Sequence, residues 1–190
     1  METSTTSDQA TRAVQQLFQE HGPAVYRLAL TLLRQHQDAE DVLQETFLKL
    51  LHHLQVGGRA SNLRGWIFTV AAHAARDRQR RRARWIPWAA SHDPVVAPPS
   101  LTDEDGRLRV VRLAAYRLSP RDRLLLALRA QGLSYREIAS AAGIRASSVG
   151  RLLARAVDRC GEACGDSQRN QKGMDFHEVP QRRQHSSSRR

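Results

Sequence analysis

The side chains best suited to binding a ligand lie between Leu133 and Arg155, in the stretch LSYREIASAAGIRASSVGRLLAR. Arginine can hold phosphate oxygens or the edge of guanine through two parallel hydrogen bonds, and a serine hydroxyl can bond to either. If the end of this stretch is helical, its basic and hydroxyl side chains share one outward face. We expect this face to enter the major groove of DNA, and it consists of Arg145, Ser147, Ser148, Arg151 and Arg155.

Two short helices are predicted to position that face. Ser134 and Glu137 form a capping-box pattern, so the first helix should begin at Tyr135. Gly143 permits a tight turn, and a second helix should begin near Ser147 or Ser148. The inward residues of that second helix would be Val149, Leu152, Leu153 and Ala156. This is the pattern of a helix-turn-helix, although helical pairs without a ligand can show a similar cap and turn.

A second candidate surface is acidic. A helix expected to begin at Asp38, DAEDVLQETFLKLLHHL, has an apolar stripe that includes Val42, Phe47 and Leu50. Its polar positions point mostly outward, and they include Asp38, Glu40, Asp41, Gln44 and Glu45. Carboxylates near a helix start also stabilise the helix dipole, so the pattern alone fits either a solvated face or a contact with a basic partner.

A third candidate surface is basic. Ser61 or Asn62 is expected to cap a helix, LRGWIFTVAAHAARDRQRRRAR, whose second half is rich in arginine. If it is helical throughout, it is about 30 Å long. A cationic rod of this kind, next to a capped loop, can hold a nucleic-acid backbone.

Composition limits the class of protein. The chain has 190 residues, a formal net charge of +11, and 41% hydrophobic but only 5% aromatic residues, which favours helices built from Leu, Ala and Val and a polyanionic partner. Two cysteines cannot frame a disulfide-stapled fold, and no apolar run reaches the roughly 18 residues of a membrane span. The N-terminus lacks a secretory-signal pattern, so we expect a cytoplasmic protein without a membrane contact.

The predicted fold is all-α, with two small helical domains joined by a flexible linker. Residues 1–84 form the first domain, with a frayed start at 1–6, a helix from Ser7 to Gly22 and another from Pro23. The proline-rich segment 85–101 is the linker. Residues 102–160 form the second domain, with helices beginning at Thr102 and at Ser119-Pro120 before the helix-turn-helix. Residues 161–190 should be a disordered basic tail.

The order of these features resembles that of bacterial RNA polymerase sigma factors of the extracytoplasmic-function type. The resemblance rests on DAEDVLQETFLKLL, LRGWIFTVAAHAARDRQRRR and LSPRDRLLLALRAQGLSYREIASAAGIRASSVGRLLARA, and covers about residues 12 to 160. It implies a non-enzymatic transcription initiation factor that needs no cofactor or metal. Such a factor binds core RNA polymerase, directs it to promoters, helps to melt the DNA and often serves a stress response.

The resemblance also implies roles for the three surfaces. The acidic residues 38 to 45 would bind the β′ clamp helices of core polymerase. The basic helix and the loop before it would bind the melted minus-ten strand through Asn62, Arg64, His73, Arg76, Arg80 and Arg81. The helix-turn-helix would bind minus-thirty-five duplex, its domain would contact the β flap, and an anti-sigma factor would be a further partner. When bound to polymerase, the protein would lie on the nucleoid.

Other functions remain open from the residues alone. A stand-alone helix-turn-helix regulator would use the second domain but leaves the acidic helix without a role. A metal-dependent nuclease could use His73 and Asp77, with His52 and His53, but no further ligand has matching spacing. Cys160 and Cys164 could bind zinc with His177 or His185, or respond to oxidants, although their spacing is not a strong metal signature.

Overall fold

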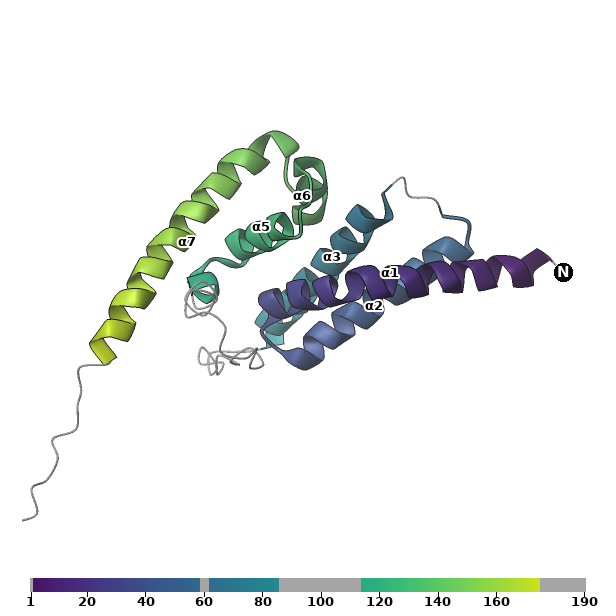
Figure 1. Ribbon diagram of the computed structural model, residues 1–190, viewed down its shortest axis with the longest axis horizontal. Helices are drawn as coiled ribbons and strands as arrows, with labels where there is room; N and C mark the ends of the chain where they lie inside the picture. Colours follow the sequence, from purple (N-terminus) through teal and green to yellow (C-terminus); the bar gives the residue numbers. More distant parts are fainter. Residues whose placement is uncertain (1, 59–61, 86–113, 175–190) are drawn as a thin grey trace, which may run out of the picture.

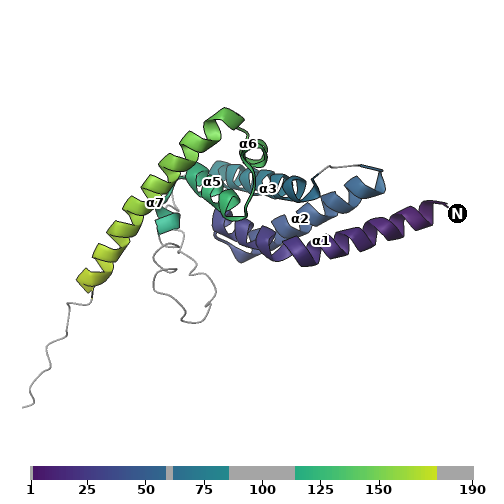
Figure 2. The same cartoon turned by 45° about the horizontal axis from the view of Figure 1, so that its top comes forward.

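A computed structural model of the chain describes residues 2–58, 62–85 and 114–174. Every regular element within these ranges is an α-helix, which confirms the predicted fold class. Figures 1 and 2 show two groups of helices, one from each half of the chain. The helices are α1 (Glu2–Leu33), α2 (His36–Gln55), α3 (Leu63–Trp85), α5 (Pro120–Ala130), α6 (Tyr135–Ala142) and α7 (Ala146–Met174).

Helix α1 corrects the prediction of two helices separated at Gly22. It continues through Gly22 and Pro23, and it extends back to Glu2 where a frayed end was expected. A proline inside a helix removes one backbone hydrogen bond. Apolar residues before and after Pro23 offset this loss by their burial, because Ala10 is 6% exposed and Val25 is fully buried. Once this helix is nucleated, each added residue forms one more backbone hydrogen bond without repeating the entropic cost of nucleation. The helix therefore extends into the polar N-terminus.

Helix α2 begins two residues earlier than predicted. Its N-cap is Gln35, whose side chain makes no cap hydrogen bond, and Asp38 lies in the first turn. A carboxylate in the first turn still stabilises the positive helix end. The predicted apolar stripe is confirmed, since Val42, Phe47 and Leu50 are all buried against the other helices of the first domain.

Helix α3 confirms one of the two predicted caps. The Asn62 Oδ1 atom accepts a hydrogen bond from the Gly65 backbone N–H over 2.9 Å. The helix ends at Trp85, which was expected to begin the linker. Its buried side includes Ile67 and Phe68, and it packs on both α1 and α2. The rest of the predicted linker lies outside the described residues.

The helix-turn-helix is confirmed in its local details. The Ser134 hydroxyl accepts from the Glu137 N–H, and the Glu137 carboxylate accepts from the Ser134 N–H, so both halves of the capping box form. Gly143 ends α6 with φ of +66°, a left-handed conformation that glycine adopts without strain. Helix α7 begins at Ala146, one residue before the predicted range. The preceding helix α5 starts at Pro120 with Ser119 as its cap, as predicted.

The predicted disordered tail is wrong for residues 161–174, because α7 continues to Met174. This segment loses the apolar period but contains no proline, and residues such as Glu162 and Ala163 propagate a helix that is already formed. Residues 175–190 lie outside the described part of the chain. So does most of the helix predicted from Thr102, of which the structure describes only the helical residues 114–117.

The two helix groups pack against each other. Helix α3 contacts α6, and α1 contacts α5. Buried residues of both groups therefore form a single connected cluster, which extends from Val25 and Phe68 to Leu128 and Ile138. This packing places the second domain directly beside the basic helix α3 (Figure 2).

Candidate functional site

The outward face of the helix-turn-helix is open to solvent. Arg145, Ser147, Arg151 and Arg155 are exposed, and Ser148 is half-buried. Three of the predicted residues, Arg145, Ser148 and Arg151, line a hollow of about 600 Å³. Arg121 of α5 lines the same hollow, although the sequence pattern did not point to it. Arg121 lines this hollow because α5 packs beside the turn, and local patterns in the sequence do not reveal that packing. Arg121, Arg145 and Arg151 therefore place several positive charges around one hollow, where they could contact the DNA backbone.

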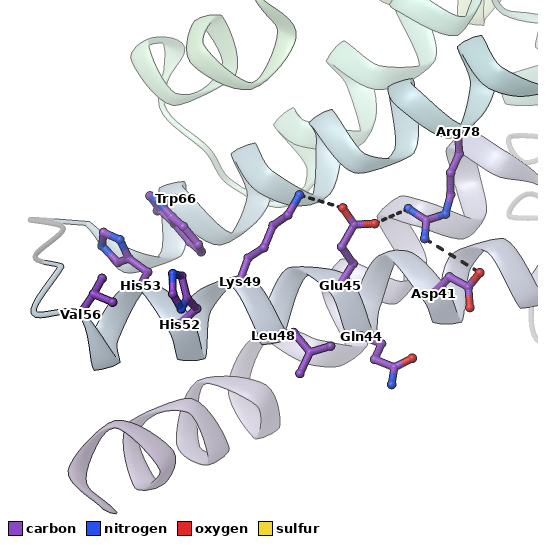
Figure 3. Close-up of a pocket in the computed structure, with 10 residues that line it drawn as sticks. All are labelled: Asp41, Gln44, Glu45, Leu48, Lys49, His52, His53, Val56, Trp66 and Arg78. Carbon is purple, nitrogen blue, oxygen red and sulfur yellow. Dashed lines mark hydrogen bonds and ion pairs between the residues drawn. The ribbon is translucent and has the colours of Figure 1, made fainter. Parts of the chain in front are cut away.

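The acidic face of α2 is interleaved with cations from two helices (Figure 3). Lys49 donates a hydrogen bond from Nζ to Glu45 Oε1 over 2.7 Å, and Arg78 of α3 donates from Nη1 to Glu45 Oε2 over 2.6 Å. These bonds, that of Lys49 foremost, lower the pKa of Glu45. Arg78 Nη2 also lies 3.9 Å from Asp41 Oδ2. The centre of the acidic face is therefore largely neutralised.

The remaining predicted residues of this face differ in exposure. Glu40 and Gln44 are exposed, while Asp38 and Asp41 are half-buried. Glu40 is the predicted carboxylate that is most open to a partner. Sequence reasoning placed Arg78 in the basic helix but missed its position against Asp41 and Glu45, which results from the packing of α3 on α2.

A hollow of about 750 Å³ runs along the same face and combines charged and apolar walls. Two large apolar side chains on it are unusually exposed, Leu48 at 58% and Val56 at 66%. Near Val56, the ring of His53 stacks on that of Trp66, with ring centroids 5.0 Å apart (Figure 3). The residues that line it, drawn in Figure 3, are Asp41, Gln44, Glu45, Leu48, Lys49, His52, His53, Val56, Trp66 and Arg78. Such a surface suits a protein partner better than a small polar ligand.

The six residues predicted to bind a single strand do not share one surface. His73, Arg80 and Arg81 are exposed on α3. Asn62 is exposed as well, but together with the half-buried Arg64 and Arg76 it donates hydrogen bonds to the second domain. Asn62 Nδ2 donates to Glu137 Oε1 over 2.6 Å, and Arg76 Nη1 donates to the carbonyl oxygen of Ala142 over 2.7 Å. Arg64 donates to the carbonyl oxygen of Gln131.

The carboxylate in this domain contact is held in its charged form. The pKa of Glu137 is lowered, first by its hydrogen bonds with Ser134 and then by those with Asn62 and the charge of Arg64. A second hydrogen bond between the domains lies just after the C-terminal end of α1, where Arg34 donates to the carbonyl oxygen of Tyr116. The contact therefore combines charge-assisted hydrogen bonds with the shared apolar core.

The alternative sites have the following geometry. Among the described residues, no group of three or more His, Cys, Asp or Glu side chains is arranged to hold a metal ion. His177 and His185 lie outside those residues. Cys160 and Cys164 are half-buried. The pKa of Cys160 is raised, mainly by burial and to a lesser extent by the neighbouring Cys164, and this disfavours the reactive thiolate. No helix in the described ranges combines the length and apolar character needed to cross a membrane.

Two family models match the chain. Sigma-70 region 2 matches residues 17–85, which contain the acidic and basic helices. Sigma-70, region 4 matches residues 108–160, which contain the helix-turn-helix.

Several known proteins are similar over most of the chain. The ECF RNA polymerase sigma factor SigE of Mycolicibacterium smegmatis is 32% identical over 76% of this chain, which corresponds to 59% of SigE. The RNA polymerase sigma factor CarQ of Myxococcus xanthus is 31% identical over 84% of this chain and 93% of CarQ. Among solved structures, the sigma factor RpoE in complex with the anti-sigma factor NepR, from Bartonella quintana, is 26% identical with a TM-score of 0.61. That match covers 78% of this chain and 94% of RpoE.

Proposed function

Because the chain belongs to the bacterial RNA polymerase sigma factors of the extracytoplasmic-function type, we propose that its charged surfaces divide the work of promoter recognition. Sigma factors are initiation factors that direct RNA polymerase, and they act by binding and not by bond chemistry. The observation that carries the proposal is that the region 2 match contains both the acidic helix α2 and the basic helix α3, while the region 4 match contains the helix-turn-helix. The stand-alone regulator is disfavoured, since it has no use for a region 2 domain.

The acidic face of α2 is proposed to bind core polymerase at the β′ clamp helices. Its residues are Asp38, Glu40, Asp41, Gln44 and Glu45. Carboxylates on a rigid helix complement a basic surface and steer its approach. The exposed Leu48 lies beside them and can add apolar contact at the centre of the interface. Lys49 and Arg78 reduce the charge of Glu45, so Glu40 is expected to contribute most to long-range attraction.

The exposed face of α7 is proposed to bind minus-thirty-five duplex DNA. Arg145, Ser148 and Arg151 would reach base edges and phosphates from the hollow described above, with Arg121 as a further phosphate contact. Arg155 lies one helical turn beyond Arg151 and would extend the contact along the groove. The same domain is proposed to rest on the β flap of polymerase.

Helix α3 is proposed to bind the melted minus-ten strand. His73, Arg80 and Arg81 are exposed and would contact the strand backbone, whereas Arg64, Arg76 and the amide of the exposed Asn62 each donate a hydrogen bond to the second domain and would contact a strand once that domain moves away. Binding energy spent on unstacked bases would favour melting. A partner of the anti-sigma class is also proposed, and the protein is proposed to act in the cytoplasm, on the nucleoid when it is bound to polymerase.

An electrophoretic mobility assay tests this division of work. Core polymerase and genomic promoter fragments are mixed with or without the protein, and fragments retained only in the ternary mixture are sequenced. Shared sequence elements at two positions, separated by a constant distance, are expected. Fragments retained equally by the protein without polymerase would favour the stand-alone regulator instead.

A further inference from the structure

Two cysteines lie one helical turn apart on α7, beyond the helix-turn-helix. Cys160 and Cys164 are separated by four positions, which places their side chains on the same side of the helix. Helix α7 continues through both residues to Met174, and Figure 1 shows that it extends well past α5 and α6. Neither cysteine belongs to the surfaces that are proposed to bind DNA or polymerase. The proposed function therefore leaves the pair without a role.

The two thiols contact each other. The thiol of Cys160 makes a side-chain hydrogen bond with that of Cys164. Both residues are half-buried, and both are free of a disulfide. This contact brings two sulfur atoms within reach of a single bound ion.

The helix opposes a disulfide between these cysteines. Side chains four positions apart on a helix have Cβ atoms about 5–6 Å apart, whereas a disulfide requires about 3.5–4.5 Å. Formation of the bond would therefore distort the turn. An ion shared by both sulfurs avoids this mismatch, since two metal–sulfur bonds of about 2.3 Å, the length found in zinc thiolates, span up to about 4.6 Å between the sulfurs. The helical geometry favours a shared ion over a covalent bond.

The turn of α7 that carries Cys160 is anchored by the residue before it. Arg159 donates a hydrogen bond from Nη1 to Asp122 Oδ2 over 2.7 Å, and the side chain of Asp122 is only 5% exposed. The same Oδ2 atom accepts a hydrogen bond over 2.8 Å from the hydroxyl of Ser119, the N-cap of α5. These bonds fix the start of the turn on α5. A ligand that binds a fixed turn loses less affinity to ordering of the chain.

The number of ligands selects the kind of ion. Structural zinc sites use four ligands in a tetrahedron. In the part of the chain that the structure describes, no group of three or more His, Cys, Asp or Glu side chains is placed to hold a metal ion. Soft thiolates favour Cu(I), which forms stable linear complexes with two sulfur ligands. Two cysteines therefore complete a Cu(I) site but supply only half of a zinc site.

We propose that Cys160 and Cys164 form a two-coordinate binding site for Cu(I) on α7. Each S–H bond is replaced by an S–Cu bond, two protons pass to solvent, and copper remains Cu(I) because no electron is transferred. Affinity therefore rises with pH. Where both thiols are protonated in the free protein, the release of two protons makes the apparent Kd fall about 100-fold per pH unit. The inference goes beyond the proposed function and does not depend on it.

Anaerobic titration of the full-length protein with Cu(I), in competition with a chromophoric Cu(I) chelator, measures the stoichiometry and the Kd. We expect one Cu(I) per chain. Loss of a group that only orients a metal ligand costs about 10–100-fold in affinity, so Cys160→Ser and Cys164→Ser should each weaken binding by more than about 100-fold. Each single variant should also reduce the pH dependence to about tenfold per unit, because only one thiol proton is left to displace.

The matched control is the double variant Cys164→Ala with Gly165→Cys. It keeps two thiols but moves one of them by about 100° around the helix. A Cβ atom built on Gly165 meets nothing within 4 Å, so the moved side chain has room. Circular dichroism establishes that every variant remains helical. We expect this control to bind Cu(I) as weakly as the single variants.

Three results would overturn the inference. The first is failure of the wild-type protein to bind one equivalent of Cu(I). The second is a double variant with wild-type affinity, which would mean that the thiols bind copper independently of their spacing. The third is displacement of Cu(I) by an equal concentration of Zn²⁺, which would indicate a site completed by further ligands, such as His177 or His185.

Discussion

Arg78 of α3 donates a hydrogen bond from Nη1 to Oε2 of Glu45 on α2, over 2.6 Å. This bond joins the basic and acidic surfaces of the first domain, which the sequence presents as separate features. Substitution of Glu45 would therefore disturb the packing of two helices as well as any partner contact. Glu40 is exposed on the same helix, which makes it the better position for a test of charge.

Glu40→Arg should weaken association with core polymerase by about tenfold or more, because reversal places a like charge against a basic partner surface. The Kd for core enzyme can be measured by fluorescence anisotropy at low and moderate salt. Asp8→Arg is the matched control, since it makes the same change at an exposed position of α1. Equal affinities of the two variants would mean that the acidic face is only solvated.

Arg151→Ala should weaken binding to duplex promoter DNA by about 1–3 kcal/mol if the guanidinium contacts a base bidentately. Association with core polymerase should be unchanged, because α7 is remote from the acidic face in this account. Arg27→Ala, which removes an exposed arginine from α1, serves as the control. Loss of polymerase binding together with DNA binding in Arg151→Ala would contradict the division between the two domains.

Gly143→Ala should destabilise the second domain by about 1–2 kcal/mol, because an L-residue is strained at the left-handed φ of +66°. The nearest atom to an added Cβ is Arg76 Nη1 at 3.5 Å, so strain and not collision is the cause. The midpoint of urea unfolding measures the effect. Gly161→Ala, in the interior of α7, should instead raise stability slightly. An unchanged midpoint in Gly143→Ala would refute the left-handed turn.

Acid should weaken the domain contact partly through Glu137. Its pKa is lower in the folded chain than in the unfolded chain, so the stability that it supplies is complete above about pH 5 and is lost as the carboxylate becomes protonated. The effect should be below about 1 kcal/mol, since the group is only partly buried. Glu137→Gln can retain a capping box but cannot titrate. Its urea midpoint should fall less than that of the wild type between about pH 5 and pH 3, and parallel profiles would contradict the role.

Local signals in the sequence predict much of this fold. The capping box at Ser134, the turn at Gly143 and the cap at Asn62 all involve residues within a few positions of one another. Their chemistry decides the structure wherever they occur. The predictions failed where longer-range packing or helix propagation overrides a local signal, as at Pro23 inside α1 and beyond Arg159 in α7.

The candidate surfaces could be predicted as sets of residues but not as assembled surfaces. The pattern identifies the arginines of α3, yet it gives no means of separating Arg78, which pairs with Glu45, from Arg76, which binds the Ala142 carbonyl. That separation depends on how α3 packs between α2 and α6. The same holds for Arg121, which lies beside the outward face of the helix-turn-helix only because α5 packs next to it.

Promoter-directed initiation is the central claim, and a run-off transcription assay tests it most directly. Purified core RNA polymerase is combined with genomic promoter fragments, with or without the protein, and the transcript starts are sequenced. The account predicts discrete starts that appear only with the protein and share two upstream elements. An unchanged set of starts, from a protein that binds duplex DNA but does not associate with core enzyme, would contradict it.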